Sequence, residues 1–161
     1  MIYQATKEDR DSIAILISSF RVELLHLKKI ESKPDIESSL DEFDEYIRKG
    51  YPIYFDKEND SYTGYLVCRV EDSLVWVESI YVEPKFRRNG IASALFEKAE
   101  ELSHSLGGDM VYNYVHPNNL KIISFLAKRG YDVLNLIEIR KPYADENFNS
   151  IVKVFYSEFR Y

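Results

Sequence analysis

The sequence predicts a single α/β domain over residues 1–161, with a mixed, mostly antiparallel sheet and helices on both of its faces. Two patterns predict this class. Three β-rich segments follow one another between Pro52 and Val82, separated by short polar turns, as in an antiparallel meander. The last of them leads through a helical pattern that starts at Ile91 into a further strand at 110–115, which is a parallel βαβ crossover.

The N-terminal part predicts a short strand and a long helix. The strand covers residues 2–5, and Thr6 with Asp9 three residues later forms a capping box for the helix. Apolar residues at helical spacing predict the buried stripe of this helix: Ile13, Leu16, Ile17, Phe20 and Leu24. Residues 26–36 are polar and contain a proline, so we expect a loop or a broken helix there.

A second helix and the meander follow. Ser39 and Glu42 repeat the capping pattern, and Gly50 lies just past the end of this helix. Its predicted buried stripe consists of Leu40, Phe43 and Ile47. The expected strands of the meander are 52–55, 62–70 and 74–82.

The rest of the chain predicts two more helices and a last strand. The helix from Ile91 ends at the glycine pair 107–108, and an asparagine-capped helix ends before Gly130. Residues 142–147 form a turn-rich break. Residues 151–161 alternate like a final strand, which could pair within the sheet or across a homodimer.

The turn between the strand 74–82 and the helix from Ile91 predicts an anion site. The first N–H groups of a helix lack internal partners and carry partial positive charge, so phosphates bind there. Gly90 lets the backbone approach a ligand closely, and Ala92 keeps that approach open. Arg87 and Arg88 add two full positive charges.

This turn resembles the Arg/Gln-x-x-Gly-x-Gly/Ala signature of the GNAT acetyltransferases, here Arg87-Arg88-Asn89-Gly90-Ile91-Ala92. The family's preceding Val-x-Pro-x-x-Arg is also present from Val82 to Arg87. The segment 119–131 is similar to the family's Asn-x-x-Ala-x-x-Leu-Tyr-x-x-x-Gly-Phe. The resemblance covers residues 75–140 and implies the GNAT fold, with a central sheet of six to seven strands.

The resemblance also implies an N-acetyltransferase that uses acetyl-CoA as its cosubstrate. The residues that would hold the pyrophosphate are Arg87, Arg88, Asn89, Gly90, Ile91, Ala92 and Ser93. The strand before the turn would bind the pantetheine arm and polarise the thioester through Ile80, Tyr81 and Val82. Asn119 would contact the cofactor or shape its channel.

Direct attack by an amine needs a base, because an amine near neutral pH is mostly protonated. Glu78 is the first candidate, since by strand alternation it shares a face with Trp76, Ile80 and Val82 and would be partly desolvated. The alternative is a structural carboxylate that pairs with an arginine. His116 is the second candidate, because imidazole titrates near neutrality.

The family's usual proton donor to the CoA thiolate is a tyrosine that aligns with Leu126, which has no proton to transfer. Three explanations stay open: another acid acts, water acts, or acyl-CoA is bound without turnover. Tyr131, Tyr112 and Tyr114 are the candidate acids by sequence position.

The composition limits the class of protein. A net charge of −6 argues against nucleic acid as a partner and suits a cationic amine. No segment approaches the length of a membrane helix, and the start of the chain does not have the pattern of a signal peptide. The single cysteine, Cys68, lies in an apolar run, and no spacing indicates a metal site. We therefore expect a cytoplasmic protein.

The acceptor is the least defined part of this interpretation. We expect the primary amine of a small molecule, bound by the loop 26–36 and the helix around 41–46. The alternatives are a protein N-terminus or lysine, and a non-catalytic acyl-CoA-binding regulatory module. No P-loop, dinucleotide-binding or Gly-x-Ser-x-Gly motif supports another nucleotide-binding or hydrolytic function.

Overall fold

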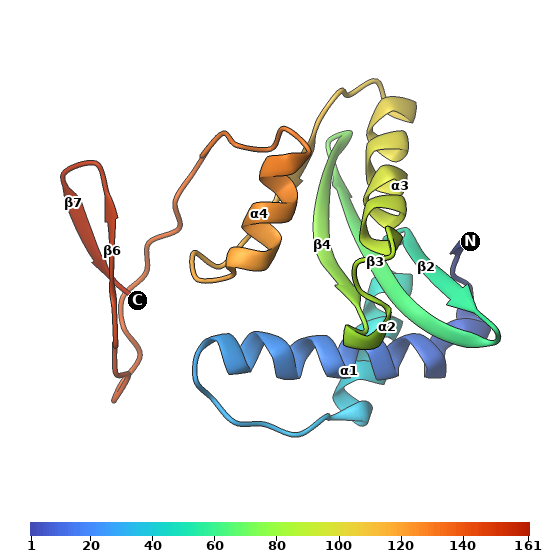
Figure 1. The fold of residues 1–161 in the computed structure, drawn as a ribbon, viewed down its shortest axis with the longest axis horizontal. Helices are drawn as coiled ribbons and strands as arrows, with labels where there is room; N and C mark the ends of the chain where they lie inside the picture. Colours follow the sequence, from blue (N-terminus) through green and yellow to red (C-terminus); the bar gives the residue numbers. More distant parts are fainter. The chain divides into compact units, whose positions relative to one another are not determined.

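The computed structural model describes residues 1–161, which divide into a first unit, Met1–Tyr114, and a second unit, Val115–Tyr161. The first unit holds the central sheet and three α-helices (Figure 1). Its elements are β1 (Ile2–Gln4), α1 (Arg10–Leu27), α2 (Ile36–Arg48), β2 (Ile53–Glu58), β3 (Ser61–Glu71), β4 (Leu74–Val82), α3 (Ile91–Ser105) and β5 (Val111–Asn113). Short 3-10 turns precede α1 and α3, at Lys7–Asp9 and Pro84–Phe86.

The central sheet has five strands in the order β1-β2-β3-β4-β5. The first four are antiparallel neighbours, and only β4 and β5 are parallel. The mixed, mostly antiparallel sheet, the meander and the βαβ crossover are therefore confirmed. The expected count of six to seven strands is wrong for this sheet, because the last two strands of the chain pair with each other instead.

The helices of the first unit cover both faces of the sheet, as expected. One face contributes Ile53, Phe55, Tyr65, Val67 and Tyr81 to a core shared with residues of α1 and α2. Strand alternation turns Tyr54, Leu66 and Cys68 to the opposite face. There α3 contacts β2, β3 and β4, and it buries Leu95, Phe96 and Ala99.

Two local predictions about helix starts have different outcomes. The capping box of Thr6 and Asp9 is present, with Asp9 accepting the Thr6 N–H at 2.8 Å, but it caps the 3-10 turn Lys7–Asp9 that leads into α1. The predicted cap at Ser39 is wrong. Asp35 is the N-cap of α2 and accepts the Ser38 N–H at 3.0 Å, while the Ser39 hydroxyl donates to the Asp35 carbonyl inside the first turn. The preceding loop is correspondingly shorter than expected, because α1 continues to Leu27.

The turns of the meander adopt the left-handed backbone typical of tight hairpins. Asn59 and Asp60 have φ of 46° and 65°, and Asp72 and Ser73 have φ of 50° and 64°. Such two-residue turns match the right-handed twist of the strands that they join. They fix the register of β2, β3 and β4, on which the site described below depends.

The second unit contains α4 (Leu120–Lys128), β6 (Ile151–Val154) and β7 (Ser157–Arg160). Asn119 caps α4, and Gly130 follows it with φ +87°, as expected. The expectation of one continuous strand over 151–161 is wrong. β6 and β7 form an antiparallel hairpin, and Phe155 lies in its turn with φ 51°.

Candidate active site

The turn between β4 and α3 presents backbone N–H groups at the start of a helix. Gly90 is the N-cap of α3, with φ +83°. The Ala94 N–H donates to the Gly90 carbonyl at 3.0 Å, so the earlier N–H groups of Ile91, Ala92 and Ser93 have no acceptor within the helix. A Cβ atom at Gly90 would meet no atom within 4 Å. The surroundings of Gly90 are therefore open, and a helix start with such donors can bind a phosphate group.

The two arginines of this turn have different environments. The Arg87 guanidinium donates from Nε to the Val82 carbonyl at 2.7 Å and from its other nitrogens to the Glu23 carboxylate at 3.2 and 2.5 Å. It also lies over the Tyr81 ring, 5.4 Å from the ring centre. Arg88 is exposed, with φ 70°. Arg87 therefore fixes the turn to β4 and α1, and Arg88 is the arginine whose charge is available to a ligand.

The strands β4 and β5 separate before β4 ends. Their parallel pairing runs from Val75 with Val111 to Val77 with Asn113, where β5 stops. β4 continues to Val82, still paired with β3 on its other side. The last part of β4 thus has a backbone edge with no neighbouring strand in the five-stranded sheet.

Backbone alternation shows which peptide groups face this open edge. The Glu83 N–H donates to the Thr63 carbonyl on the β3 side, at 2.9 Å. The Tyr81 N–H, two residues earlier, faces β3 as well, so the peptide groups of Ile80 and Val82 face the open edge. Tyr81 instead contributes its ring to the core, with 7 % of the residue exposed. Of the three residues expected to bind the pantetheine arm, two have peptide groups at this edge.

A β-bulge interrupts β4 beside this edge. Val67 pairs with Ser79, but the next residue of β3, Cys68, pairs with Val77. Glu78 is the extra residue on β4, and a bulge of this kind bends the strand and changes the direction of its side chains.

The bulge corrects the predicted alternation around Glu78. Simple alternation places Glu78 on one face with Trp76, Ile80 and Val82. In the structure Glu78 is on the Trp76 side, because it pairs with Arg69, the cross-strand partner of Trp76. Ile80 and Val82 are on the opposite face, because the extra residue reverses the phase of the strand after it.

Glu78 lies in a charged environment rather than in an apolar one. Its carboxylate is 3.6 Å from the Arg69 Nε, and 34 % of its side chain is exposed. Arg69 also contacts Glu71 at 3.3 Å. The ion pair is the arrangement expected of a structural carboxylate, and the exposed fraction leaves Glu78 accessible to an amine.

Asn119, His116 and Tyr131 lie in the second unit, whereas the other two candidate acids, Tyr112 and Tyr114, lie in the first. The Asn119 Oδ1 accepts the Ile122 N–H at 3.4 Å, so this side chain caps α4. The His116 Nδ1 lies 3.1 Å from the Tyr161 hydroxyl, which donates to the Asn118 Oδ1 at 3.0 Å. Leu126 is buried, and its carbonyl accepts the Tyr131 N–H at 3.0 Å. His116 is thus held near the C-terminal residue of the chain.

Two residues of the site, Glu23 and Arg69, cannot be predicted from local sequence patterns. Glu23 is 64 residues from Arg87 in the chain, and Arg69 meets Glu78 across a bulge. No local spacing links either pair. The charge of Arg69 inside a β-rich segment was the only available signal.

Cys68 has no sign of reactivity. It is fully buried, and burial raises the pKa of its thiol to about 12. No group of three or more His, Cys, Asp or Glu side chains is arranged to hold a metal ion. None of the helices has both the length and the apolar character needed to cross a membrane.

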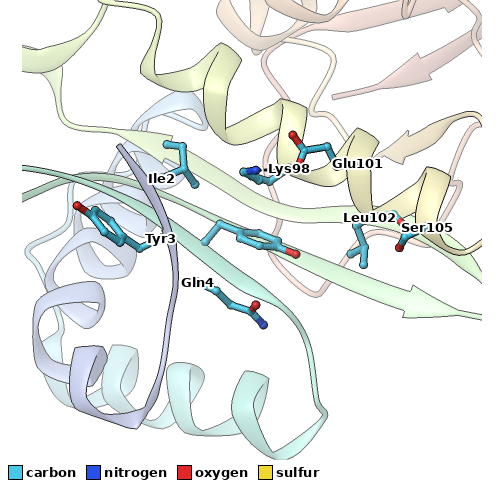
Figure 2. A pocket seen from close by; sticks show the side chains of 8 residues that line it. Ile2, Tyr3, Gln4, Lys98, Glu101, Leu102 and Ser105 are labelled. Atoms are coloured by element: carbon cyan, nitrogen blue, oxygen red, sulfur yellow. Dashed lines mark hydrogen bonds and ion pairs between the residues drawn. The ribbon is translucent and has the colours of Figure 1, made fainter.

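A separate hollow of about 380 Å³ lies between β1 and the C-terminal half of α3 (Figure 2). Its lining includes Gln4, Tyr54, Leu102 and the ion pair of Lys98 with Glu101, whose atoms are 2.6 Å apart. Leu102 is twelve residues along α3 from Gly90, or about 18 Å at the usual helical rise. This hollow is therefore not part of the site at the start of α3.

Comparisons with known proteins identify a family and a fold. The model of the acetyltransferase (GNAT) family matches residues 19–131. A solved probable acetyltransferase is 20% identical, with a TM-score of 0.71 over 91% of this chain and 99% of that chain. AAC(6')-Iy, in complex with the bisubstrate analog CoA-S-monomethyl-acetylneamine, is 18% identical, with a TM-score of 0.69 over 89% and 98%. The aminoglycoside antibiotic 6'-N-acetyltransferase AAC(6')-IG from Acinetobacter haemolyticus is 16% identical, with a TM-score of 0.62 over 91% and 99%. At these identities the likeness to solved structures shows the fold.

Proposed function

The chain belongs to the GNAT acetyltransferase family, and from this premise we propose that it transfers the acetyl group of acetyl-CoA to the primary amine of a small molecule. The family match runs from residue 19 to residue 131 and so spans both units. We therefore propose that residues 1–161 act as one acetyltransferase domain.

The observation that carries this proposal is the open helix start at Gly90. The N–H groups of Ile91, Ala92 and Ser93 would donate to the pyrophosphate of acetyl-CoA, and Arg88 would add its charge. Asn89 belongs to the same exposed turn. Because Arg87 is held by Glu23 and Val82, its role in this proposal is to fix the turn.

The open edge of β4 would bind the pantetheine arm. The N–H and carbonyl of Ile80 and the N–H of Val82 face this edge, where a strand would otherwise pair, while the Val82 carbonyl already accepts from Arg87. A backbone N–H here can also stabilise the negative charge that develops on the thioester oxygen during attack. Asn119 remains a candidate for a cofactor contact.

Glu78 would act as the base. The bulge places it at the point where β4 and β5 separate, and its side chain is accessible. It would take a proton from the ammonium form of the acceptor and so free the nitrogen for attack on the acetyl carbon. His116 is the second candidate for this role.

The proposal of a small amine as acceptor has two supports. The net charge of −6 favours a cationic substrate. In addition, two of the structurally similar proteins are aminoglycoside acetyltransferases by name. The loop between α1 and α2, residues 28–35, and residues 41–46 of α2 would bind this acceptor.

One observation favours a second candidate, a regulatory module that binds acyl-CoA without turnover. Leu126 occupies the position that aligns with the family's usual proton donor, and a leucine cannot donate a proton. Release of the CoA thiol separates the candidates when acetyl-CoA is offered with neamine, spermidine, a peptide with a free N-terminus and a lysine peptide. We expect thiol release with an amine of low molecular mass.

Control variants and the choice of acceptors separate the three candidate functions. A Gly90→Gln variant should release no thiol, because its side chain would fill the phosphate path. Release only with peptides would favour a protein acetyltransferase. Tight binding of acetyl-CoA without release by the native chain, together with activity in a Leu126→Tyr variant, would favour the regulatory module.

A further inference from the structure

Tyr114 lies at the point where β4 and β5 separate. The parallel register pairs Trp76 with Tyr112 and then Val77 with Asn113. One more step along both strands leads to Glu78 on β4 and Tyr114 after the end of β5. Tyr112 and Tyr114 are two residues apart, so their side chains share the face that carries Trp76 and Arg69. Tyr114 is therefore level with Glu78, across the opening between the two strands.

Arg69 links Tyr114 to Glu78. Its guanidinium lies 3.6 Å from the Glu78 carboxylate and over the Tyr114 ring, 5.7 Å from the ring centre. Partial burial of Arg69 disfavours its charge, but the nearby Tyr114, Glu71 and Glu78 outweigh this effect and raise the pKa of the guanidinium. An arginine can only donate hydrogen bonds, so toward Arg69 the Tyr114 oxygen can act only as an acceptor. The hydroxyl proton of Tyr114 can then be donated to another group.

Stacking on Trp76 fixes the position of the Tyr114 ring. The ring centres of Trp76 and Tyr114 are 4.8 Å apart, at an interplanar angle of 15°. Tyr112 also stacks on Trp76, with its ring centre at 4.6 Å and an angle of 28°. Even so, 64 % of Tyr114 is exposed, so a substrate can reach it. The ring is held on one side and accessible on the other, as a proton donor requires.

We propose that Tyr114 is the general acid that protonates the leaving thiolate of CoA. This inference rests on the proposed function. In the step, the amine nitrogen bonds to the acetyl carbon and the C–S bond breaks with its electron pair on sulfur. The Tyr114 O–H proton then moves to that sulfur, and Tyr114 regains a proton from solvent. An ammonium acceptor loses two protons in all, so the reaction yields the amide, the thiol and one proton.

In this assignment, the two proton transfers take place on opposite sides of the opening between β4 and β5. Glu78 receives a proton on the β4 side, and Tyr114 supplies one from the end of β5. Arg69 would act as a positioning residue, because it contacts both side chains. Leu126, which cannot supply a proton, is then not needed as the donor.

The test compares two substitutions that each remove one hydroxyl and keep the ring on Trp76. We expect Tyr114→Phe to lower kcat by about 10- to 100-fold, since the thiolate can still leave slowly, without a change in the Kd of acetyl-CoA. Tyr112→Phe, its matched control, should keep the native kcat. Thiol release with the most active amine of the panel above gives both values.

Rescue by an added acid separates proton donation from a structural effect. Phenol added at constant pH and ionic strength should raise the kcat of Tyr114→Phe in proportion to its concentration, and it should leave Tyr112→Phe unchanged. A native kcat in Tyr114→Phe, or a loss that phenol does not restore, would overturn the assignment. The same loss and rescue in Tyr131→Phe instead would also overturn it. If the native chain acetylates no amine or peptide, the proposed function itself fails.

Discussion

The carboxylate of Glu23 on α1 accepts two hydrogen bonds from the guanidinium of Arg87, at 3.2 and 2.5 Å. Arg87 also donates to the Val82 carbonyl at the end of β4. This arginine therefore joins α1, β4 and the turn before α3. A residue that the motif groups with the phosphate ligands is held here by protein partners on two sides.

The two arginines of the turn should respond differently to substitution. Arg87→Lys loses the paired geometry toward Glu23, so the free energy of unfolding should fall by about 1–2 kcal/mol. Arg88→Ala should leave that free energy unchanged and weaken acetyl-CoA binding by roughly fivefold, or about 1 kcal/mol. Denaturant titration and calorimetric binding measure the two effects. Native acetyl-CoA affinity in Arg88→Ala would contradict the assignment of its charge to the ligand.

Gly90 can be tested against a glycine of the same conformation at the other end of α3. Gly90 and Gly107 have φ of +83° and +84°, and a Cβ atom would meet no other group within 4 Å at either position. Gly90→Gln and Gly107→Gln should therefore each lower the free energy of unfolding by about 1 kcal/mol. Only Gly90→Gln should abolish the rise in melting temperature that CoA produces. Equal stabilisation of both variants by CoA would disprove a phosphate site at Gly90.

Glu78 and Glu71 offer another matched pair, since both carboxylates contact Arg69, at 3.6 and 3.3 Å. Glu78→Gln should lower kcat by about 100-fold and leave the Kd of acetyl-CoA nearly unchanged, because only the base is lost. Glu71→Gln should keep both parameters. Initial rates of thiol release and calorimetric binding of acetyl-CoA give the comparison, and equal losses in the two variants would indicate a structural ion pair.

The capping residue Asp9 makes part of the stability of the fold dependent on pH. Asp9 accepts the Tyr62 hydroxyl at 2.6 Å and the Thr6 N–H at 2.8 Å. Partial burial raises the pKa of Asp9, but these hydrogen bonds outweigh it and hold the pKa below the ordinary 3.8. A lowered folded-state pKa stabilises the fold above pH 3.8, and this contribution is lost as the pH falls through the lowered value.

Tyr62→Phe keeps the stacking on Phe55, whose ring centre is 4.6 Å away, and removes the hydroxyl that Asp9 accepts. At pH 7 its free energy of unfolding should be about 1 kcal/mol lower than that of the native chain. The difference should shrink as the pH falls below 3.8, because Asp9 becomes protonated in both proteins. Denaturant unfolding at several pH values measures it, and a difference that does not change with pH would show that Asp9 is not involved.

Much of the fold could be predicted because it depends on local patterns. The bounds of β4, the start of α3 at Ile91 and the glycine at its end follow from β-rich composition, helical spacing and turn residues. The cap of α2 could not be predicted with the same certainty. Asp35 and Ser39 are both good caps, and the path of the loop before them decides between the two.

The face of Glu78 shows the limit of alternation. Side-chain alternation assumes an uninterrupted strand, but β4 has one extra residue where it pairs with β3. The final segment shows a related limit. Alternation over 151–161 fits one long strand as well as two short ones, and the turn at Phe155 becomes visible only through the pairing of β6 with β7.

The sequence by itself determined the class of fold and the chemistry of the turn at Gly90. A helix start after a basic, glycine-containing turn binds anions wherever it occurs, so local residues are sufficient to predict it. The tertiary structure decided which arginine is held by Glu23, which peptide groups face the open edge of β4, and that Glu78, Arg69 and Tyr114 meet. These relationships join residues far apart in the chain, and only strand register and packing bring their atoms within reach.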